Sequence, residues 1–278
     1  MFVDSHCHVY ETAYDRFLEG REIFHPPAFY NPEAILSRAK KANVQILLTI
    51  GTQISDIDEM SKIVDSYNEI FMTVGIHPEY AKEHLQKFSK EEIQQLFEEC
   101  CKSKKTVGIG EIGLDYFTNK DIDEQKDLFD FQLSLAEQFK LPVSVHTRES
   151  WIDTMDLIEV HRDTRGIIHC FSGEENLAKR AIDADYLLGI GGVVTFKNSL
   201  ALQEAVKWIP LESIVLETDA PWLAPVPFRG KVNEPSFIPN IAEKIAEIKC
   251  VSIEKVEEIT TKNFLKLFKK IELGDLDE

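Results

Sequence analysis

The amino-acid sequence predicts an α/β fold, a closed TIM-type (β/α)8 barrel, and three observations favour it. Eight short runs of β-prone residues recur from end to end, and stretches with helical periodicity separate them. The length of 278 residues suits a barrel that forms one domain. A doubly wound open sheet also alternates strands and helices, but no glycine-rich dinucleotide turn follows the first strand, so we rank the open sheet second.

Each expected strand is a short apolar run bounded by turn residues. Between the runs, apolar side chains recur at spacings of three and four, as in the segment 125–136. Such a face predicts a helix that packs on the outside of the barrel. In chain order the expected strands cover residues 2–9, 44–50, 70–76, 106–112, 142–146, 166–170, 186–190 and 213–218.

Two segments do not fit this repeat. The segment 11–31 holds Phe17, Phe24 and the pair Pro26-Pro27 without a clear period, and it predicts a long loop that overhangs the active face. The segment 252–271 follows the eighth unit and predicts an extra amphipathic C-terminal helix, so we expect a single domain over residues 1–278. Its polar run is expected to form a solvated face: Lys262, Lys266, Lys269 and Lys270.

Composition is that of a globular enzyme and argues against several other classes. Hydrophobic residues make up 44% of the chain, and no stretch approaches the roughly 18 consecutive apolar residues of a membrane span. No signal-peptide pattern opens the chain, and its five cysteines suggest no disulfide framework, so we expect a reducing, cytoplasmic location. The net charge of −17 argues against a long duplex-binding groove but is compatible with a pocket that takes a chain end beside bound cations.

Residues of the metal-ligating type occur at the ends of several expected strands. His6 and His8 occupy positions i and i+2 of the first strand, so both side chains point to the same side. Two histidines this close also occur by chance, and alone they are a weak signal. Barrel enzymes gather their reactive groups at the C-terminal strand ends, where four further residues are expected to converge with this pair: Glu111, His146, His169 and Asp219.

Four imidazoles and two carboxylates exceed the needs of one tetrahedral ion and suit two divalent cations that share a carboxylate. Glu111 is the natural bridge because a carboxylate offers two oxygens. His6, His8 and Asp219 would complete one site, and His146 and His169 the other. Imidazole ligands favour zinc, manganese, iron or cobalt. The sequence indicates no obligate protein partner.

Over nearly its whole length the sequence resembles the TatD family of metal-dependent deoxyribonucleases, within the broader amidohydrolase-like barrels. The resemblance is specific because many motifs occur in the same order. They are residues 4–8 (DSHCH), 74–78 (VGIHP), 110–116 (GEIGLDY), 142–148 (PVSVHTR), 169–173 (HCFSG), 192–198 (GVVTFKN), 217–225 (ETDAPWLAP) and 229–235 (RGKVNEP).

The resemblance implies that the six residues named above are the family's metal ligands, and it allows magnesium as the metal. His77 resembles the family's phosphate-facing histidine, and Arg148, two residues beyond His146, would point the same way. His77 could instead fix a turn before Pro78, and Arg148 could pair with Asp115 or Glu149. Two further basic residues, in the loops where barrels often bind phosphate, are either substrate contacts or solvent-facing charges: Lys197 and Arg229.

The expected activity is hydrolysis of phosphodiester bonds, and the resemblance points to a 3′-5′ exodeoxyribonuclease that trims single-stranded DNA ends. Glu111, Asp219 and His77 are the expected catalytic residues, with Asp219 accepting a proton from the attacking water. The same centre could serve an amidohydrolase or an aminoacyl-ester deacylase, and a non-catalytic scaffold ranks third. The chain departs from the family pattern in its long segment 11–31 and in Tyr10, which stands where aspartate is frequent.

Overall fold

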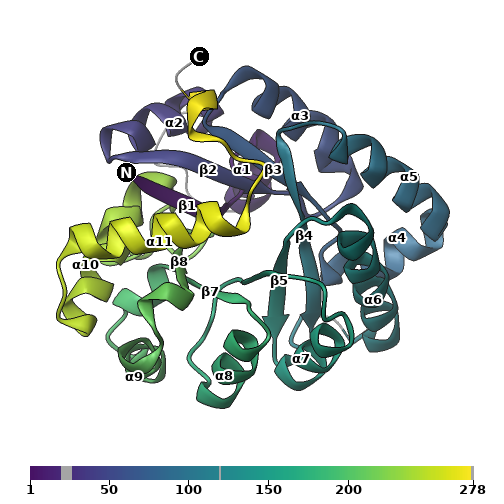
Figure 1. Cartoon of the computed structure of the whole chain (residues 1–278). Coiled ribbons are helices and arrows are strands. Elements are labelled where there is room, and N and C mark those ends of the chain that lie inside the picture. Colours follow the sequence, from purple (N-terminus) through teal and green to yellow (C-terminus); the bar gives the residue numbers. More distant parts are fainter. Residues whose placement is uncertain (20–26, 119, 277–278) are drawn as a thin grey trace.

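A computed structural model of the chain describes residues 1–19, 27–118 and 120–276. Its eight strands are parallel and lie side by side in chain order (Figure 1). Backbone bonds close the ring, because Asp219 N–H donates to His6 O and His8 N–H donates to Ala220 O, each at 2.8 Å. The expected barrel is therefore confirmed. The strands are β1 Phe2–Cys7, β2 Val44–Ile50, β3 Ile70–Val74, β4 Thr106–Asp115, β5 Val143–Arg148, β6 Gly166–Ile168, β7 Leu187–Ile190 and β8 Ile214–Leu216.

Helices surround the strands, and local sequence explains where several begin. The Asn31 side chain accepts the Ala34 N–H at 2.8 Å, and Ser89 and Glu92 form a reciprocal capping box. The helices are α1 Glu11–Leu18, α2 Pro32–Lys41, α3 Ile57–Ser66, α4 Ala81–Lys87, α5 Lys90–Cys101, α6 Ile122–Phe139, α7 Trp151–Val160, α8 Glu175–Asp183, α9 Leu200–Trp208, α10 Ile238–Lys249 and α11 Ile253–Leu267. Among the described residues, no helix is both long enough and apolar enough to cross a membrane.

The helix α11 covers the N-terminal end of the barrel (Figure 1). Phe264 and Phe268 are almost fully buried and pack against strand residues such as Ile46, Phe71 and Val107. The expected C-terminal helix thus closes one end of the barrel interior. The opposite end, where the strands finish, remains available for the site.

One lysine of this C-terminal segment does not belong to a solvated face, contrary to expectation. Lys270 is half-buried, and its ammonium group donates to the carbonyls of Cys101, Ser103 and Thr106 at 3.2, 2.8 and 2.6 Å. Burial lowers the pKa of Lys270. The lysine thus ties the end of the chain to the last residue of α5, to the α5–β4 connection and to the first residue of β4. The other three lysines of the run are exposed: Lys262, Lys266 and Lys269.

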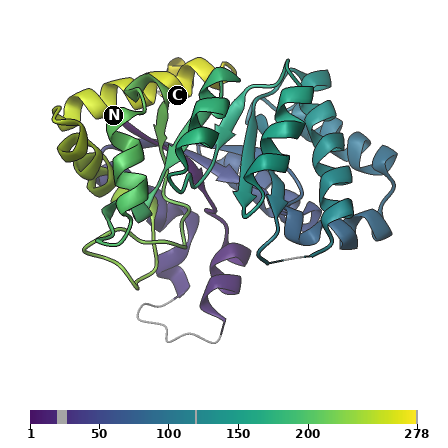
Figure 2. The same ribbon diagram turned by 90° about the horizontal axis from the view of Figure 1, so that it is seen from below.

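The segment 11–31 is also not the uninterrupted loop that the sequence suggested. Its first part forms α1, in which Ala13, Tyr14 and Phe17 are buried. These positions share one helix face, and the helix is stabilised by tertiary packing because eight residues are too few for a stable isolated helix. Residues 20–26 lie outside the described part of the chain. In Figure 2, α1 projects from the barrel on the side away from α11, at the strand ends that carry the site.

Candidate metal centre

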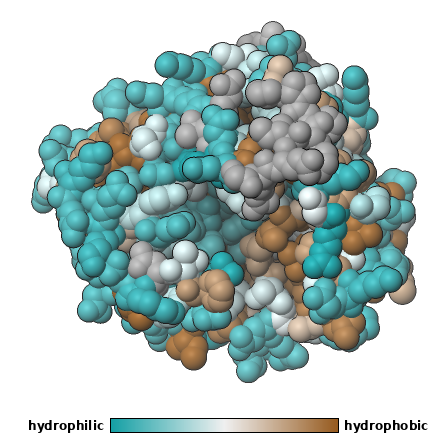
Figure 3. Space-filling view, turned by 180° about the vertical axis from the view of Figure 1, so that it is seen from behind, coloured by the Kyte–Doolittle hydropathy of each residue, from teal (hydrophilic) through white to brown (hydrophobic). Residues whose placement is uncertain are grey.

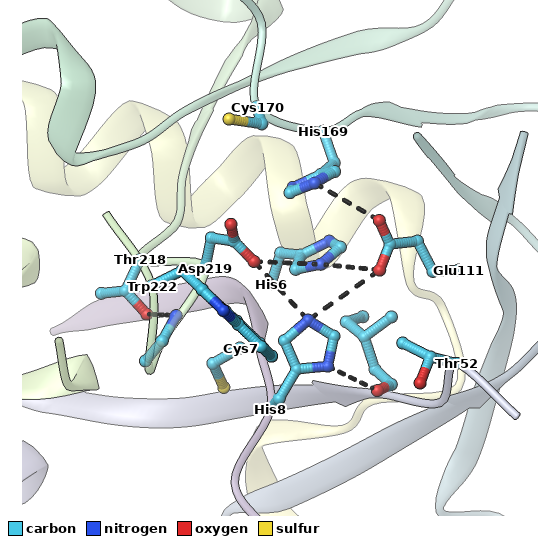
Figure 4. A network of polar contacts seen from close by, with 12 residues as sticks. His6, Cys7, His8, Thr52, Glu111, His169, Cys170, Thr218, Asp219 and Trp222 are labelled. Carbon is cyan, nitrogen blue, oxygen red and sulfur yellow. Dashed lines mark hydrogen bonds and ion pairs between the residues drawn. The ribbon is translucent and has the colours of Figure 1, made fainter. Parts of the chain in front are cut away.

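Glu111 on β4 lies at the centre of a cluster of imidazoles at the C-terminal ends of the strands (Figure 4). Its Oε2 is 3.6 Å from His6 Nε2 and 3.9 Å from His8 Nε2. Its Oε1 is 3.0 Å from His146 Nδ1 and 3.5 Å from His169 Nε2. The two carboxylate oxygens therefore face two different groups of histidines.

Asp219, in the turn after β8, faces the first of these groups. Its Oδ1 lies 3.5 Å from His8 Nε2 and 3.9 Å from His6 Nε2. The structure thus brings together all six residues that the sequence singled out as ligands. Ligand-type atoms of two triads, which share Glu111, lie within 4.8 Å of one another: His6, His8 and Glu111, and His77, Glu111 and His146.

Partners behind the rings determine which nitrogen faces the centre. His8 Nδ1 donates to Ile50 O at 2.9 Å, and His169 Nδ1 donates to Glu217 Oε1 at 3.2 Å. In the neutral form of both rings this arrangement leaves the lone pair on the inward Nε2, as a metal ligand requires. His146 is oriented the opposite way, because its Nε2 contacts Asp115 Oδ2 at 3.1 Å and its Nδ1 faces Glu111.

The ring nitrogens of His6 and His77 have different hydrogen-bond partners. His6 Nδ1 contacts Ser144 Oγ at 3.1 Å, and its buried Nε2 has no hydrogen-bond partner among the described residues. A buried ring nitrogen without a hydrogen-bond partner that faces two carboxylates fits a site for a cation. At His77, in contrast, Nδ1 accepts the Glu79 N–H at 3.2 Å. In the neutral ring the proton is then on Nε2, which faces Glu111 Oε1 at 3.6 Å as a donor.

Burial and opposite charges shift the pKa values of the cluster. Burial would raise the pKa of Glu111, but the imidazoles of His77, His146 and His6 hold it well below its ordinary range. Burial would lower the pKa of His169, but the adjacent Glu217 carboxylate raises it to about 10. The metal-free cluster therefore contains ionised carboxylate next to imidazolium, and a bound cation would replace the imidazolium proton.

Two further pKa shifts concern expected catalytic groups. Burial lowers the pKa of His77 to about 3, so its ring is neutral. Burial would raise the pKa of Asp219, but the His8 hydrogen bond and the charges of His169 and His6 lower it. Asp219 is consequently ionised at neutral pH and can accept a proton only if the attacking group is itself acidified.

The centre forms the floor of a pocket of about 240 Å³. Figure 3 shows the face opposite to that of Figure 1, with a hollow near its middle, hydrophilic side chains within it and hydrophobic surface along part of its rim. The pocket is at the lower end of the size range of small-molecule sites and is far too small for a duplex. Its lining residues are His8, Tyr10, Arg16, Thr52, His77, Glu79, Tyr80, Glu111, His146, His169, Asp219 and Trp222.

Of the four substrate contacts expected from the sequence, His77 alone lines this pocket. Arg148 is exposed and does not pair with Asp115, which instead holds His146; its guanidinium lies 3.9 Å from the centroid of the Phe117 ring. Arg229 is exposed with its guanidinium 4.4 Å from the Phe196 ring centroid, and Lys197 is exposed. As the turn alternative suggested, His77 also caps the short helical turn that begins at Pro78.

Two residues of the site were missed by the sequence reasoning. Glu217 is fully buried, accepts the Cys170 N–H at 2.6 Å and orients His169. A glutamate two positions before Asp219, at the end of an apolar strand, was a usable signal for it, because such a carboxylate is buried only with a partner. Arg16 lines the pocket from α1, and no pattern in the segment 11–31 marked it.

Comparisons with known proteins agree with this geometry. A family model described as TatD related DNase matches residues 3–269. YabD of Bacillus subtilis, described as an uncharacterized metal-dependent hydrolase, is 35% identical over 272 residues, which cover 97% of this chain and 99% of YabD. A similar hydrolase of Buchnera aphidicola, BU355, is 34% identical over 96% of this chain and 98% of its own length.

Among solved structures, the crystal structure of the TatD homologue YjjV from Escherichia coli matches with a TM-score of 0.84 at 29% identity, covering 96% of this chain and 98% of YjjV. The expected resemblance is therefore confirmed. The protein belongs to the TatD family of metal-dependent hydrolases.

Proposed function

We propose that this hydrolase cleaves phosphodiester bonds at a centre of two divalent cations, magnesium, manganese or zinc, and trims single-stranded DNA from its 3′ end. The observation that carries the proposal is the position of Glu111, whose two oxygens face separate groups of imidazoles. His6, His8 and Asp219 would hold one cation and His146 and His169 the other, with Glu111 shared. Two such cations supply Lewis-acid polarisation of phosphoryl oxygens and acidify a water molecule.

The protein's own groups then have distinct roles. Asp219, ionised beside His8, accepts the proton of the attacking water. His77 is neutral and carries its proton on the inward Nε2, so it donates to a phosphoryl oxygen and is no metal ligand. The tautomers therefore support the roles that the family resemblance implies, in which His8 and His169 are metal ligands and His77 contacts the substrate.

The surroundings of the pocket favour a single strand as the substrate. Two cation–aromatic pairs lie at the C-terminal ends of the strands: Arg148, the last residue of β5, over Phe117, and Arg229 over the partly exposed Phe196. Stacked rings and guanidinium groups bind unpaired bases without sequence preference. We assign these pairs, with the exposed Lys197, to the strand outside the pocket, whereas the small pocket admits only its terminal nucleotide.

Two substrate assays test the function. The metal-loaded protein is given single-stranded DNA labelled at its 5′ end, and release of mononucleotides is measured against hydrolysis of an aminoacyl ester and a dipeptide. Successive shortening of the labelled strand from its 3′ end is expected. Turnover of the carbonyl substrates alone would reassign the centre to amidohydrolase or deacylase chemistry, and metal analysis of protein purified without chelator identifies the cations.

Replacing His77 with alanine is expected to lower phosphodiester hydrolysis about tenfold to a hundredfold, because it removes one donor to the phosphoryl group. Metal content should stay at the parental value, since the inward nitrogen of His77 carries a proton. A matched control is His84→Ala, which removes a buried histidine of α4 that does not line the pocket. Loss of metal from the His77 variant would show that this ring is a ligand.

Binding of single-stranded DNA is expected to weaken only modestly with salt. With a net charge of −17 and a pocket for one nucleotide, we expect contact with two or three phosphates and a slope of log K against log salt of about −2. The slope is measured with a short fluorescent strand. A slope near −10, as in groove-binding repressors, or tighter binding of duplex, would contradict the chain-end interpretation.

A further inference from the structure

The metal-centre pocket contains one side chain with a permanent positive charge. Among its described lining residues, Arg16 is the only arginine or lysine, whereas Glu79, Glu111 and Asp219 are acidic. Arg16 comes from α1, in the segment 11–31, where no sequence pattern marked it as a site residue. This segment therefore contributes directly to the pocket.

Arg16 is anchored through a buried carboxylate. Its Nη2 donates to Asp56 Oδ1 at 3.0 Å, and Asp56 is only 2% exposed. The second carboxylate oxygen of Asp56 accepts the hydroxyl groups of Thr52 at 2.9 Å and Tyr10 at 3.2 Å. Tyr10 therefore helps to hold the residue that anchors Arg16.

Anchoring alone does not explain why an arginine occupies this place. Apolar residues already fix α1, because Ala13, Tyr14 and Phe17 are buried and the Phe17 ring contacts Trp222 at 6.0 Å between centroids. The Arg16 side chain itself remains 30% exposed and lines the pocket. Asp56 and a hydrogen bond with Tyr80 orient the guanidinium at the pocket wall, and a charged group oriented in this way is pre-organised to attract an anion that enters the pocket.

We propose that Arg16 binds the phosphate group of the substrate in the metal-centre pocket and thereby selects anionic phosphodiesters over neutral esters. The inference rests on the proposed phosphodiesterase function and assigns to α1 a second phosphate contact in the pocket, in addition to His77. A planar guanidinium fork matches two phosphate oxygens, whereas a neutral ester offers no charge for it to complement.

The test compares Arg16→Gln and Arg16→Lys with the parental protein. Binding of inorganic phosphate to the metal-loaded proteins is measured by calorimetry, and kcat and KM are measured for a thymidine dinucleotide and for p-nitrophenyl acetate. For Arg16→Gln we expect phosphate affinity and kcat/KM for the dinucleotide to fall about tenfold to a hundredfold. Turnover of the neutral ester should fall far less than turnover of the dinucleotide, so the ratio of the two kcat/KM values should shift towards the ester, and Arg16→Lys should recover part of the phosphate affinity.

Arg38→Gln is the matched control. Arg38 is also half-buried and pairs with a carboxylate, Glu234, at 2.6 Å, but it does not line the metal-centre pocket. Both glutamine variants lose one ion pair, so thermal unfolding shows whether they are destabilised alike. Only Arg16→Gln is expected to lose phosphate affinity. An equal loss of phosphate affinity in both variants would show that Arg16 has only a structural role.

The outcomes separate this inference from the proposed function. Parental cleavage of the dinucleotide with unchanged phosphate binding in Arg16→Gln would overturn the role of Arg16 and leave the phosphodiesterase intact. Weakened phosphate binding in a protein that hydrolyses only carbonyl esters would support Arg16 as the anion contact and overturn the proposed function.

Discussion

Replacing Glu111 with alanine is expected to remove bound metal and to lower hydrolysis by at least about a thousandfold. Removing a single preorganised contact to the transition state already lowers kcat about a hundredfold to a thousandfold. The effect at Glu111 should be larger because its carboxylate faces both groups of imidazoles at once. Metal content by elemental analysis and the initial rate on single-stranded DNA measure the two effects. Folding should largely persist, because the apolar core of the barrel does not depend on this carboxylate.

Glu69→Ala is a suitable control for this substitution. Glu69 is a partly buried glutamate that pairs with Lys40 and directly precedes β3, at the end of the barrel away from the site. Its loss should leave metal content and activity at the parental values. A Glu111 variant that keeps two metals and its activity would show that another carboxylate bridges them. Retention of one metal would indicate that His6, His8 and Asp219 hold a cation unaided.

Replacing Asp219 with asparagine is expected to lower kcat about a hundredfold to ten-thousandfold, the range that a positioned general base contributes. Asparagine keeps an oxygen where Asp219 Oδ1 faces His6 and His8, but it cannot accept a proton. KM for the dinucleotide should change little, because the interaction that is lost develops in the transition state.

Asp219→Ala provides the comparison for this second effect. Alanine removes both the ligand oxygen and the base, so metal content should fall together with the rate. If the Asp219→Asn variant also loses metal, the main role of Asp219 is to attract the cation through its negative charge. If the asparagine variant hydrolyses DNA at the parental rate, another group accepts the proton.

Much of the fold could be predicted because its signals are local. Alternating runs of apolar residues and helical periodicity depend on near neighbours, and they located all eight strands. The helix α1 was missed because eight residues with only three buried apolar positions carry too weak a pattern. Lys270 was misassigned because its three carbonyl partners lie more than 160 residues away in the chain.

The sequence by itself determined the barrel, the family and which strand ends carry ligand-type residues, because side-chain alternation and the polarity of parallel strands bring those ends to one face. Only the tertiary structure decided how each residue acts. In the neutral rings the inward Nε2 is an acceptor in His8 and His169 but a donor in His77, because Ile50 O and Glu217 accept from Nδ1 whereas Glu79 N–H donates to it. Two of these partners come from other strands, and a tautomer follows from such contacts and not from residue type. In the same way, packing of α1 brings Arg16 into the pocket, while Arg148 lies outside it against Phe117.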